Sequence, residues 1–191
     1  MKRLSLYLFL ILFTLQTPSQ ADDIRDFQIE GISIGDSLLD YISKEEIKKY
    51  KAQYYKDDTY SSVTIFPNTT SINFKLYDSI VLSYKTNDDK FLLRGLSGII
   101  KYQNNIDECF VKMDEVINDL SEVFSNANPT KIKTIRTTHG KNTYSIFNLD
   151  FGDRASVQCT DYDAKYEYID HLRIVIDKRD FSNWIDNEAY K

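Results

Sequence analysis

An apolar pattern between residues 106 and 124 constrains the fold of this chain more than any other feature. Its large apolar side chains recur every three or four residues, the spacing that places them on one face of an α-helix. The members of this stripe are Ile106, Cys109, Phe110, Met113, Val116, Ile117, Leu120, Val123 and Phe124. Asn105 precedes the stripe as a helix N-cap, with Glu108 three residues later. The sequence therefore predicts an amphipathic helix over residues 106–124.

A β-hairpin over residues 143–161 is the element expected to lie against this helix. Its two arms contain alternating apolar residues, which are Phe147, Leu149, Phe151, Ala155, Val157 and Cys159. A two-residue turn at Gly152 and Asp153 would place the apolar sets of the two arms on opposite faces. We therefore expect a three-residue loop over 152–154, which pairs Leu149 with Val157 and Phe147 with Cys159. In this register Cys159 faces the helix that carries Cys109.

The first residues of the chain have the three-part pattern of a secretory signal peptide. Lys2 and Arg3 precede an apolar run at 4–15, and a short polar segment at 16–21 ends in Ala21. The run is well short of the roughly 20 apolar residues that span a bilayer, which argues against the alternative of an uncleaved anchor. We expect cleavage after Ala21, a periplasmic or secreted location, and no stable membrane insertion after cleavage.

The chain has two cysteines, Cys109 and Cys159. An even number of cysteines in an exported protein favours a disulfide, because the compartment outside the cytoplasm is oxidising. A bridge between them would close a loop of about 50 residues and stabilise the fold by roughly 4 kcal/mol in the chain-entropy model. The alternative is a pair of buried free thiols. Neither flank carries the pattern of a catalytic cysteine.

The remaining patterns predict an α+β protein with one domain over residues 22–191. Ser43 and Glu46 form a capping box, and it joins two short helices within residues 36–54. Asp180 is expected to cap a short final helix. Strand patterns occur at 60–66, 71–76, 79–85, 91–102, 131–138 and 169–176. Runs of strands after a helix are typical of a helix packed on an antiparallel sheet, here with two similar halves over 35–102 and 105–176.

Two segments carry a resemblance to other proteins. The sequence ISIGDSLLDY at 32–41, followed by SKEEI at 43–47, and the ending with Trp184 and Ile185 are similar to those of an uncharacterised family. That family consists of small exported proteins of AT-rich, marine alphaproteobacterial type. The resemblance implies a bacterial, periplasmic setting and no functional residue. The predicted plan also resembles β-lactamase-inhibitor-like and outer-membrane-assembly domains, in architecture alone.

The net charge of the chain argues against nucleic acid as a partner. The formal net charge is −5, and loss of Lys2 and Arg3 with the signal would make it −7. An acidic chain is poorly suited to nucleic acid, because neutralisation of phosphates supplies most of the nonspecific affinity. Neither His139 nor His171 lies in a recognisable catalytic motif.

The acids of residues 150–170 are interpreted as solvated turn residues, with a noncanonical calcium site as the alternative. Asp161 and Asp163 could begin a calcium loop, but Lys165 and Tyr166 occupy positions where an EF-hand needs an oxygen ligand and glycine. We therefore predict no metal, no cofactor and no catalytic residue.

Two groups of residues are candidates for a binding face. Lys131, Lys133 and Arg136, with Lys141, form a basic segment, which either protects an exposed edge strand or contacts an anionic partner. Tyr50 and Tyr54 either wedge a helix onto the sheet or form a platform for sugar or peptide.

Taken together, these features favour a noncatalytic periplasmic binding or interaction module whose partner is an envelope protein or a glycan. An envelope-assembly factor would differ only in its partner. The alternative is a hydrolase-like enzyme with a site built from scattered acids and a histidine.

Overall fold

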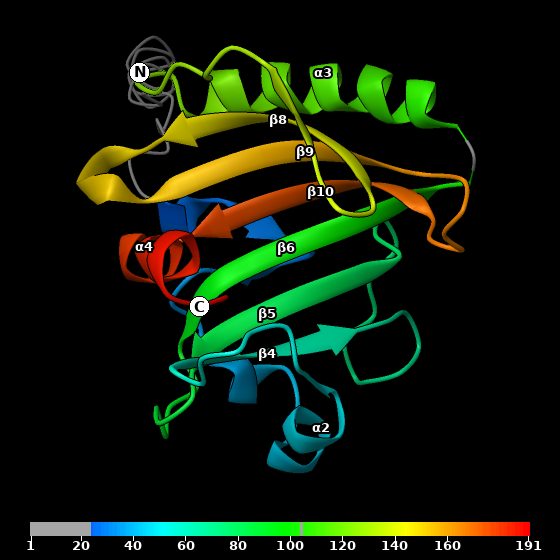
Figure 1. Ribbon diagram of the computed structural model, residues 1–191. Coiled ribbons are helices and arrows are strands. Elements are labelled where there is room, and N and C mark those ends of the chain that lie inside the picture. The colour runs from blue at the N-terminus through cyan, green and yellow to red at the C-terminus, as the bar shows by residue number, and fades with distance from the viewer. Residues whose placement is uncertain (1–23, 104) are drawn as a thin grey trace, which may run out of the picture.

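The protein folds around one large antiparallel sheet of eight strands, with a second sheet of only two strands (Figure 1). The computed structural model describes residues 24–103 and 105–191. Three α-helices accompany the sheets, so the predicted α+β class is confirmed. The predicted signal peptide and Ala21 lie outside the described residues.

The described elements follow one another in a simple order. They are η1 Ile24–Asp26, β1 Gln28–Ile29, β2 Ile32–Ser33, η2 Leu38–Asp40, α2 Lys44–Lys49, β3 Lys51–Ala52, β4 Tyr60–Ile65, β5 Ser79–Lys85, β6 Leu93–Tyr102, α3 Ile106–Val123, β7 Lys133–Arg136, β8 Gly140–Asn148, η3 Asp150–Gly152, β9 Arg154–Tyr162, β10 Asp170–Asp177 and α4 Arg179–Asn187.

The strand order has an internal symmetry. The order is β3-β4-β5-β6-β10-β9-β8-β7, so two four-stranded meanders meet edge to edge. Their last strands, β6 and β10, pair in the centre of the sheet, from Asp170 opposite Tyr102 to Asp177 opposite Gly95. Helical segments precede each meander in the chain, η2 and α2 before β3 and α3 before β7. This is the topology that two halves over residues 35–102 and 105–176 would produce.

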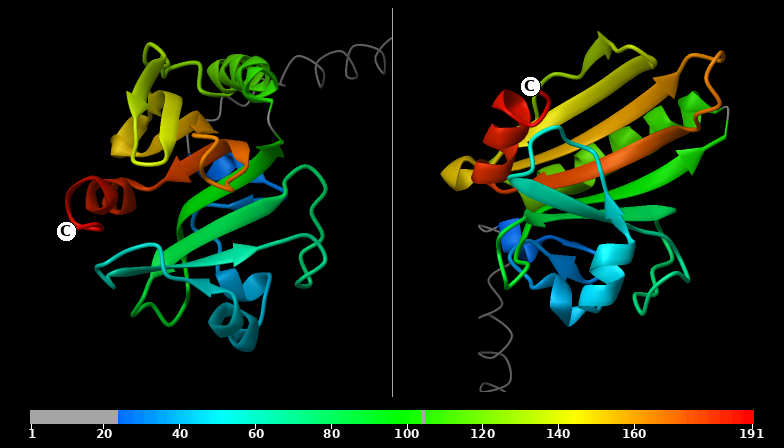
Figure 2. Two further views of the ribbon diagram at one scale, coloured as in Figure 1. Left: turned by 45° about the vertical axis from the view of Figure 1, so that its right-hand side comes forward. Right: turned by 60° about the horizontal axis from the view of Figure 1, so that its bottom comes forward.

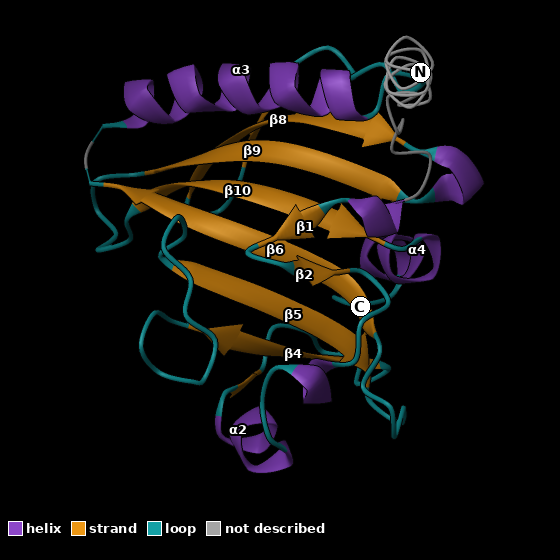
Figure 3. Ribbon diagram, turned by 180° about the vertical axis from the view of Figure 1, so that it is seen from behind, coloured by secondary structure: helices purple, strands orange, loops and turns teal. Residues whose placement is uncertain are grey.

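One face of the sheet carries the whole main core. Strand pairing aligns Leu82, Leu96 and Ile176 across β5, β6 and β10, and all three are buried. The β1–β2 hairpin and α2 cover this face over the first meander, as Figure 3 shows for the hairpin. Helix α3 covers it over β9 and β10. Burying a large apolar side chain contributes about 1.5–3 kcal/mol, so this face supplies most of the driving force for folding.

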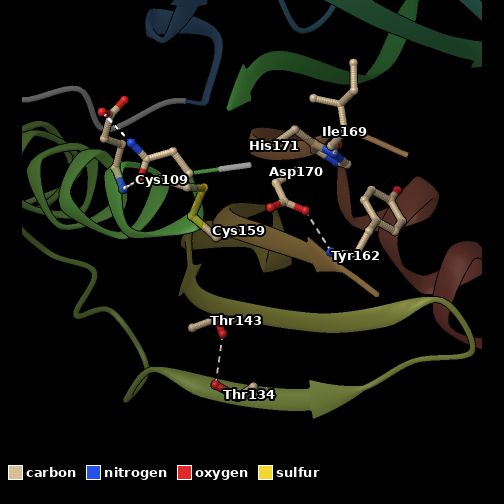
Figure 4. The surroundings of a disulfide bond; sticks show 10 residues. Cys109, Thr134, Thr143, Cys159, Tyr162, Ile169, Asp170 and His171 are labelled. Carbon is tan, nitrogen blue, oxygen red and sulfur yellow. Dashed lines mark hydrogen bonds between the residues drawn. A yellow bond between two sulfur atoms is a disulfide. The ribbon is translucent and has the colours of Figure 1, made fainter. Parts of the chain in front are cut away.

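Helix α3 is held to the sheet by packing and by a covalent bond (Figure 4). The predicted helix is confirmed, with the side chain of Asn105 capping its first turn. Cys109 and Cys159 form the predicted disulfide, with their Cα atoms 6.0 Å apart. Both cysteines are buried beside Met113 and Leu120 of the helix stripe. The bond therefore joins the helix to β9 within the core.

The predicted register of the β8–β9 hairpin is wrong by four residues. Phe147 pairs with Ala155, and Cys159 pairs with Thr143. The connection is longer than expected because the η3 turn lies inside it, closed by a hydrogen bond from the Leu149 amide to the Asp153 carbonyl. A shift by an even number of residues keeps every side chain on its face. Cys159 therefore still points inward, as predicted, although its partner differs.

Two local predictions in the first half also fail. Helix α2 begins with the predicted capping box but ends at Lys49, so Tyr54 does not extend it. Residues 71–76 form no strand, because β4 and β5 pair directly and leave no edge for another strand between them. The amides of Lys75 and Leu76 donate instead to the carboxylate of Glu30.

The cap of α4 comes from a distant residue. Asp153 accepts a hydrogen bond from the Arg179 amide at 2.9 Å, and its second oxygen accepts one from Lys178 Nζ at 2.8 Å. Asp180, the predicted cap, lies inside the helix and pairs with Lys85 and Arg94. A buried carboxylate thus joins the β8–β9 turn to the last helix.

Candidate functional site

The face of the sheet opposite the main core is mostly polar. Side chains of Ser97, Arg173 and Gln158 lie on this face near the centre, where Arg173 Nε and Nη2 donate to Ser97 Oγ. We call it the open face, and Figure 1 shows α4 lying over one end of it. A sheet with one polar face leaves that face available for contacts other than folding.

Helix α4 fills its end of the open face with aromatic side chains. Phe181 packs over Gly95, where a Cβ atom would overlap its ring. The ring centroid of Trp184 lies 4.8 Å from that of Tyr60, and its Nε1 donates to Asp57. This end of the open face is therefore a second, smaller core.

A buried carboxylate lies beside α4. Asp177 is only 5% exposed, and burial raises its pKa to about 6, while Arg154 at 3.6 Å and Arg173 act in the opposite direction. Arg154 also binds Asp186 of α4 at 3.0 Å. These groups pair with one another, so we assign them to the docking of α4.

The other end of the open face carries the candidate site, a cluster of five rings. The members of this aromatic cluster are His139, Tyr162, Tyr166, Tyr168 and His171. The rings of Tyr166 and Tyr168 are nearly parallel, with centroids 5.8 Å apart. His139 meets both of them edge-on, and Tyr162 lies between Tyr168 and His171. Both histidines of the chain are thus in one cluster.

Hydrogen bonds and an ion pair hold the loop that presents these rings. The Asp163 amide donates to the His139 carbonyl at 2.8 Å, which ties the β9–β10 loop to the β7–β8 turn. Arg136 Nη2 donates to the Asp163 carboxylate at 2.6 Å. At the loop's far end, Asp170 accepts a hydrogen bond from the Tyr162 amide (Figure 4). The rings therefore project from a fixed support.

The cluster is accessible and has unused hydrogen-bonding capacity. Tyr168 is 56% exposed and His139 is exposed as well. The neighbouring Asn142 Oδ1 is buried and lacks a donor within the described part of the chain. Pairing places Asn142 beside Thr160, and Thr160 beside His171. A buried acceptor of this kind is unusual in a folded protein.

The protonation state of His171 and the hydrogen bonds of the two histidines favour a role in binding over one in catalysis. Burial lowers the pKa of His171, so its ring is neutral at pH 7. Its Nδ1 lies 3.2 Å from the Ile169 carbonyl, which can only accept, so Nδ1 carries the proton and Nε2 is an acceptor. Within residues 24–103 and 105–191, neither imidazole has a hydrogen bond to a carboxylate, hydroxyl or thiol side chain.

The residues proposed from sequence do not meet at one site. Tyr50 and Tyr54 lie beside the short edge strand β3, where their hydroxyls contact Thr69 and Thr64. The basic residues lie at the opposite edge of the sheet, with Lys133 and Arg136 in β7 and Lys131 just before it. Arg136 alone reaches the aromatic cluster, through Asp163.

Sequence reasoning missed the tyrosines of the cluster. The segment YDAKYEY at 162–168 contains three of them, interspersed with Asp163 and Glu167, which suggest a solvated turn. The spacing of these tyrosines, between the predicted hairpin and the predicted strand at 169–176, is a signal for such a cluster.

A cavity of about 330 Å³ lies at the other end of the same strands. Asp150, Asp153 and Asp180 line it, and neither histidine does. The described residues also contain no cluster of three or more metal-binding side chains. The carboxylates and histidines that the hydrolase alternative needs are therefore not brought together in this cavity.

Comparison with protein-family models, with curated proteins and with solved structures finds no match for this chain. Among the described residues, no helix combines the length and apolar character that crossing a bilayer requires.

Proposed function

We propose that this chain is an exported periplasmic protein that binds a partner protein without catalysis, through the aromatic cluster on its open face. The observation that carries this proposal is the gathering of five rings from three separate segments of the chain, with His139 and Tyr168 exposed. The main core lies on the opposite face of the sheet, so the cluster is not needed to fill it.

The composition of the cluster favours a protein partner. Tyrosine offers a large contact area at little cost in side-chain entropy and is enriched at the centres of protein interfaces. Charged residues surround the rings as a rim, with Lys165 over the ring of Tyr166 and Arg136 paired to Asp163. A glycan could also stack on the tyrosines, and the experiment below includes it as an outcome.

Export is supported by the disulfide and by the sequence. A buried disulfide persists in oxidising compartments and is rare in the cytosol. The signal pattern at residues 1–21 supports export, and the resemblance to a family of exported bacterial proteins supports a periplasmic setting. The formal charge of the chain disfavours nucleic acid as the partner.

The experiment compares partners captured from the native periplasm by two variants. In Tyr166→Ala/Tyr168→Ala the parallel rings are removed, and both positions lie in a loop outside the main core. The control is Tyr54→Ala, which removes a tyrosine that is 47% exposed beside the opposite edge of the sheet. Affinity capture with mass spectrometry should recover a partner with wild type and Tyr54→Ala, and lose it with the double variant.

Three results would contradict the proposal. One is a partner retained by the double variant at wild-type levels. Another is capture of polysaccharide in place of protein, which would make the cluster a glycan site. The third is capture of no partner combined with turnover of a substrate from a hydrolase panel. The thermal transition of each variant, measured in parallel, separates loss of binding from loss of folding.

A further inference from the structure

The 330 Å³ cavity is distinct from the aromatic cluster and has a different chemistry. It lies between the C-terminal end of α3, the β8–β9 turn and the start of α4. Ile24, Phe124 and Leu149 give it apolar walls, continuous with the main core. Small-molecule sites have volumes upward of about 300 Å³ and are mostly apolar with a few polar groups, so this cavity is large enough for a small organic ligand.

Phe151 stands at the rim of the cavity in an unfavourable state. Its side chain is 86% exposed, and its backbone has φ 59° and ψ 8°. This left-handed region disfavours bulky residues because the Cβ atom approaches the carbonyl oxygen. The fold therefore holds an aromatic ring in water in a strained conformation, without burying it. Strain of this kind is concentrated at functional sites, and a ligand in the cavity would cover the ring.

Most of the charges around the cavity neutralise one another. Lys178 binds Asp153 at 2.8 Å. Asp180 is shared between Arg94 at 3.7 Å and Lys85 at 3.6 Å, so two cations face one carboxylate. The lining contains three basic and three acidic side chains, so its formal charge is balanced, and Lys85 adds one positive charge beside Asp180.

Two basic groups in the lining have unused donors. The Nε–H of Arg94 is buried and has no acceptor in the part of the chain that the structure describes. The alkyl chain of Arg179 lies against Gly152, and its guanidinium forms no ion pair with any described carboxylate. Asp150 is a lining acid that also has no ion pair among the described residues, so the test must include a cationic ligand. A buried donor without an acceptor is unfavourable, and an anionic ligand would supply the missing acceptor.

We propose that this cavity binds a small organic anion, with a carboxylate at Arg94 and Arg179 and an apolar body between Phe124 and Phe151. The apolar walls and the strained ring indicate that the body of the ligand is apolar. The unused donors indicate that its head group is negatively charged. This site lies outside the aromatic cluster and does not depend on the proposed function.

The test uses three probes that share one body and differ in the head group: phenylbutanoate, phenylbutanol and phenylbutylamine. Each is titrated into the purified protein, and amide chemical shifts are followed by heteronuclear NMR. Phenylbutanoate should shift, saturably, the amides of the β8–β9 turn and the first turn of α4. The alcohol should bind about tenfold more weakly, because it lacks the charge-assisted hydrogen bonds. The amine should bind more weakly still.

Variants separate the roles of the ring and the charge. Phe151→Gly removes the ring and also relieves the left-handed strain, so it should weaken phenylbutanoate about tenfold without lowering the thermal transition. Arg179→Gln should remove the preference for the anion over the alcohol. The control is Phe66→Ala, which removes an exposed aromatic side chain that does not line the cavity and should leave the affinity unchanged.

Several results would overturn the proposal. Absence of a saturable shift with any of the three probes would show that the cavity does not take such ligands. Tighter binding of the amine would assign the site to Asp150 and to cations. Unchanged affinity in Phe151→Gly, or equal losses in Phe151→Gly and Phe66→Ala, would remove Phe151 from the site.

Discussion

Reduction of the Cys109–Cys159 disulfide should lower the free energy of unfolding by about 4 kcal/mol. The bond joins residues separated by 50 positions in the sequence. In the chain-entropy model, a cross-link of this span removes roughly 14 cal/mol/K from the unfolded chain, which is about 4 kcal/mol at room temperature. For a domain of this size, that loss corresponds to a fall in Tm of about 8–16 °C.

Two perturbations separate the cross-link from the packing around it. Reduced wild type keeps both sulfur atoms in the core and loses only the bond. The variant Cys109→Ala/Cys159→Ala also loses buried volume, because both positions are fully buried, so it should be less stable than reduced protein by about 1 kcal/mol or more. Urea unfolding, followed by the fluorescence of the single tryptophan, Trp184, measures all three forms. The slope against urea should rise on reduction, because the unfolded chain becomes less compact.

The reasoning fails if reduced and oxidised protein differ by less than about 1 kcal/mol, since the bond would then not restrict the unfolded state as the model requires. It also fails if the exported protein, denatured without reductant, shows two titratable thiols. A double alanine variant as stable as oxidised wild type would show that α3 is held to β9 by packing alone.

Two further predictions concern the end of the sheet under α4. Asp177→Asn should raise the free energy of unfolding at pH 7 by up to about 3 kcal/mol, because burial raises the pKa of this carboxyl to about 6 from an ordinary 3.8. The contribution of Asp177 to stability is fully present below about pH 4 and is lost as the pH rises through 6, so urea unfolding across this range should show a fall with pH in wild type that the variant lacks. Gly95→Ala should lower Tm by several degrees and shift the emission of Trp184 to the red, because a Cβ atom would displace the ring of Phe181; unchanged emission would contradict this packing.

Local periodicity predicted the elements whose large apolar side chains share one face. The stripe of α3, the capping box at Ser43 and the alternation of Ile80, Leu82 and Tyr84 in β5 all recur in the structure. Each depends on neighbours within a few residues, so the sequence contains the needed information. Two separate arguments predict the disulfide: the oxidising compartment and the inward orientation of Cys159. The error in the hairpin register affects only the second argument, and it leaves the orientation of Cys159 unchanged.

The failures lie where a distant part of the chain decides the outcome. The β8–β9 turn takes extra residues because Asp153 is drawn into the cap of α4, through Lys178 and the Arg179 amide. Phe151 was expected to face the core because it continued the alternation of Phe147, yet the turn lifts it into solvent. An alternating pattern cannot show where a strand stops when the stop is imposed by a helix 26 residues later.

The aromatic cluster could not be assembled from sequence for a similar reason. His139 and His171 were each assessed alone, and each lacked a motif. Both belong to one cluster, linked through Tyr168 and Tyr162, because β8 and β10 flank β9 and because Asp163 bonds to both Arg136 and the His139 carbonyl. Without a resemblance that supplies the strand order, no spacing in the sequence indicates this convergence.

The two candidate sites lie at opposite ends of the same strands. Variants at one site can therefore serve as controls in the binding assay of the other. Strand β9 runs from Arg154, next to the cavity, to Tyr162 in the aromatic cluster, a span of about 26 Å at the rise of an extended strand. It is hydrogen-bonded on both sides and joined covalently to α3 between its ends. These bonds disfavour a second arrangement of the strand that one ligand could select, and coupling between the sites would require such an arrangement. Phe151→Gly should therefore leave partner capture intact, and Tyr166→Ala/Tyr168→Ala should leave the affinity for phenylbutanoate intact. A loss in both assays from either variant would mean that the variant disturbs the sheet itself and reports on folding.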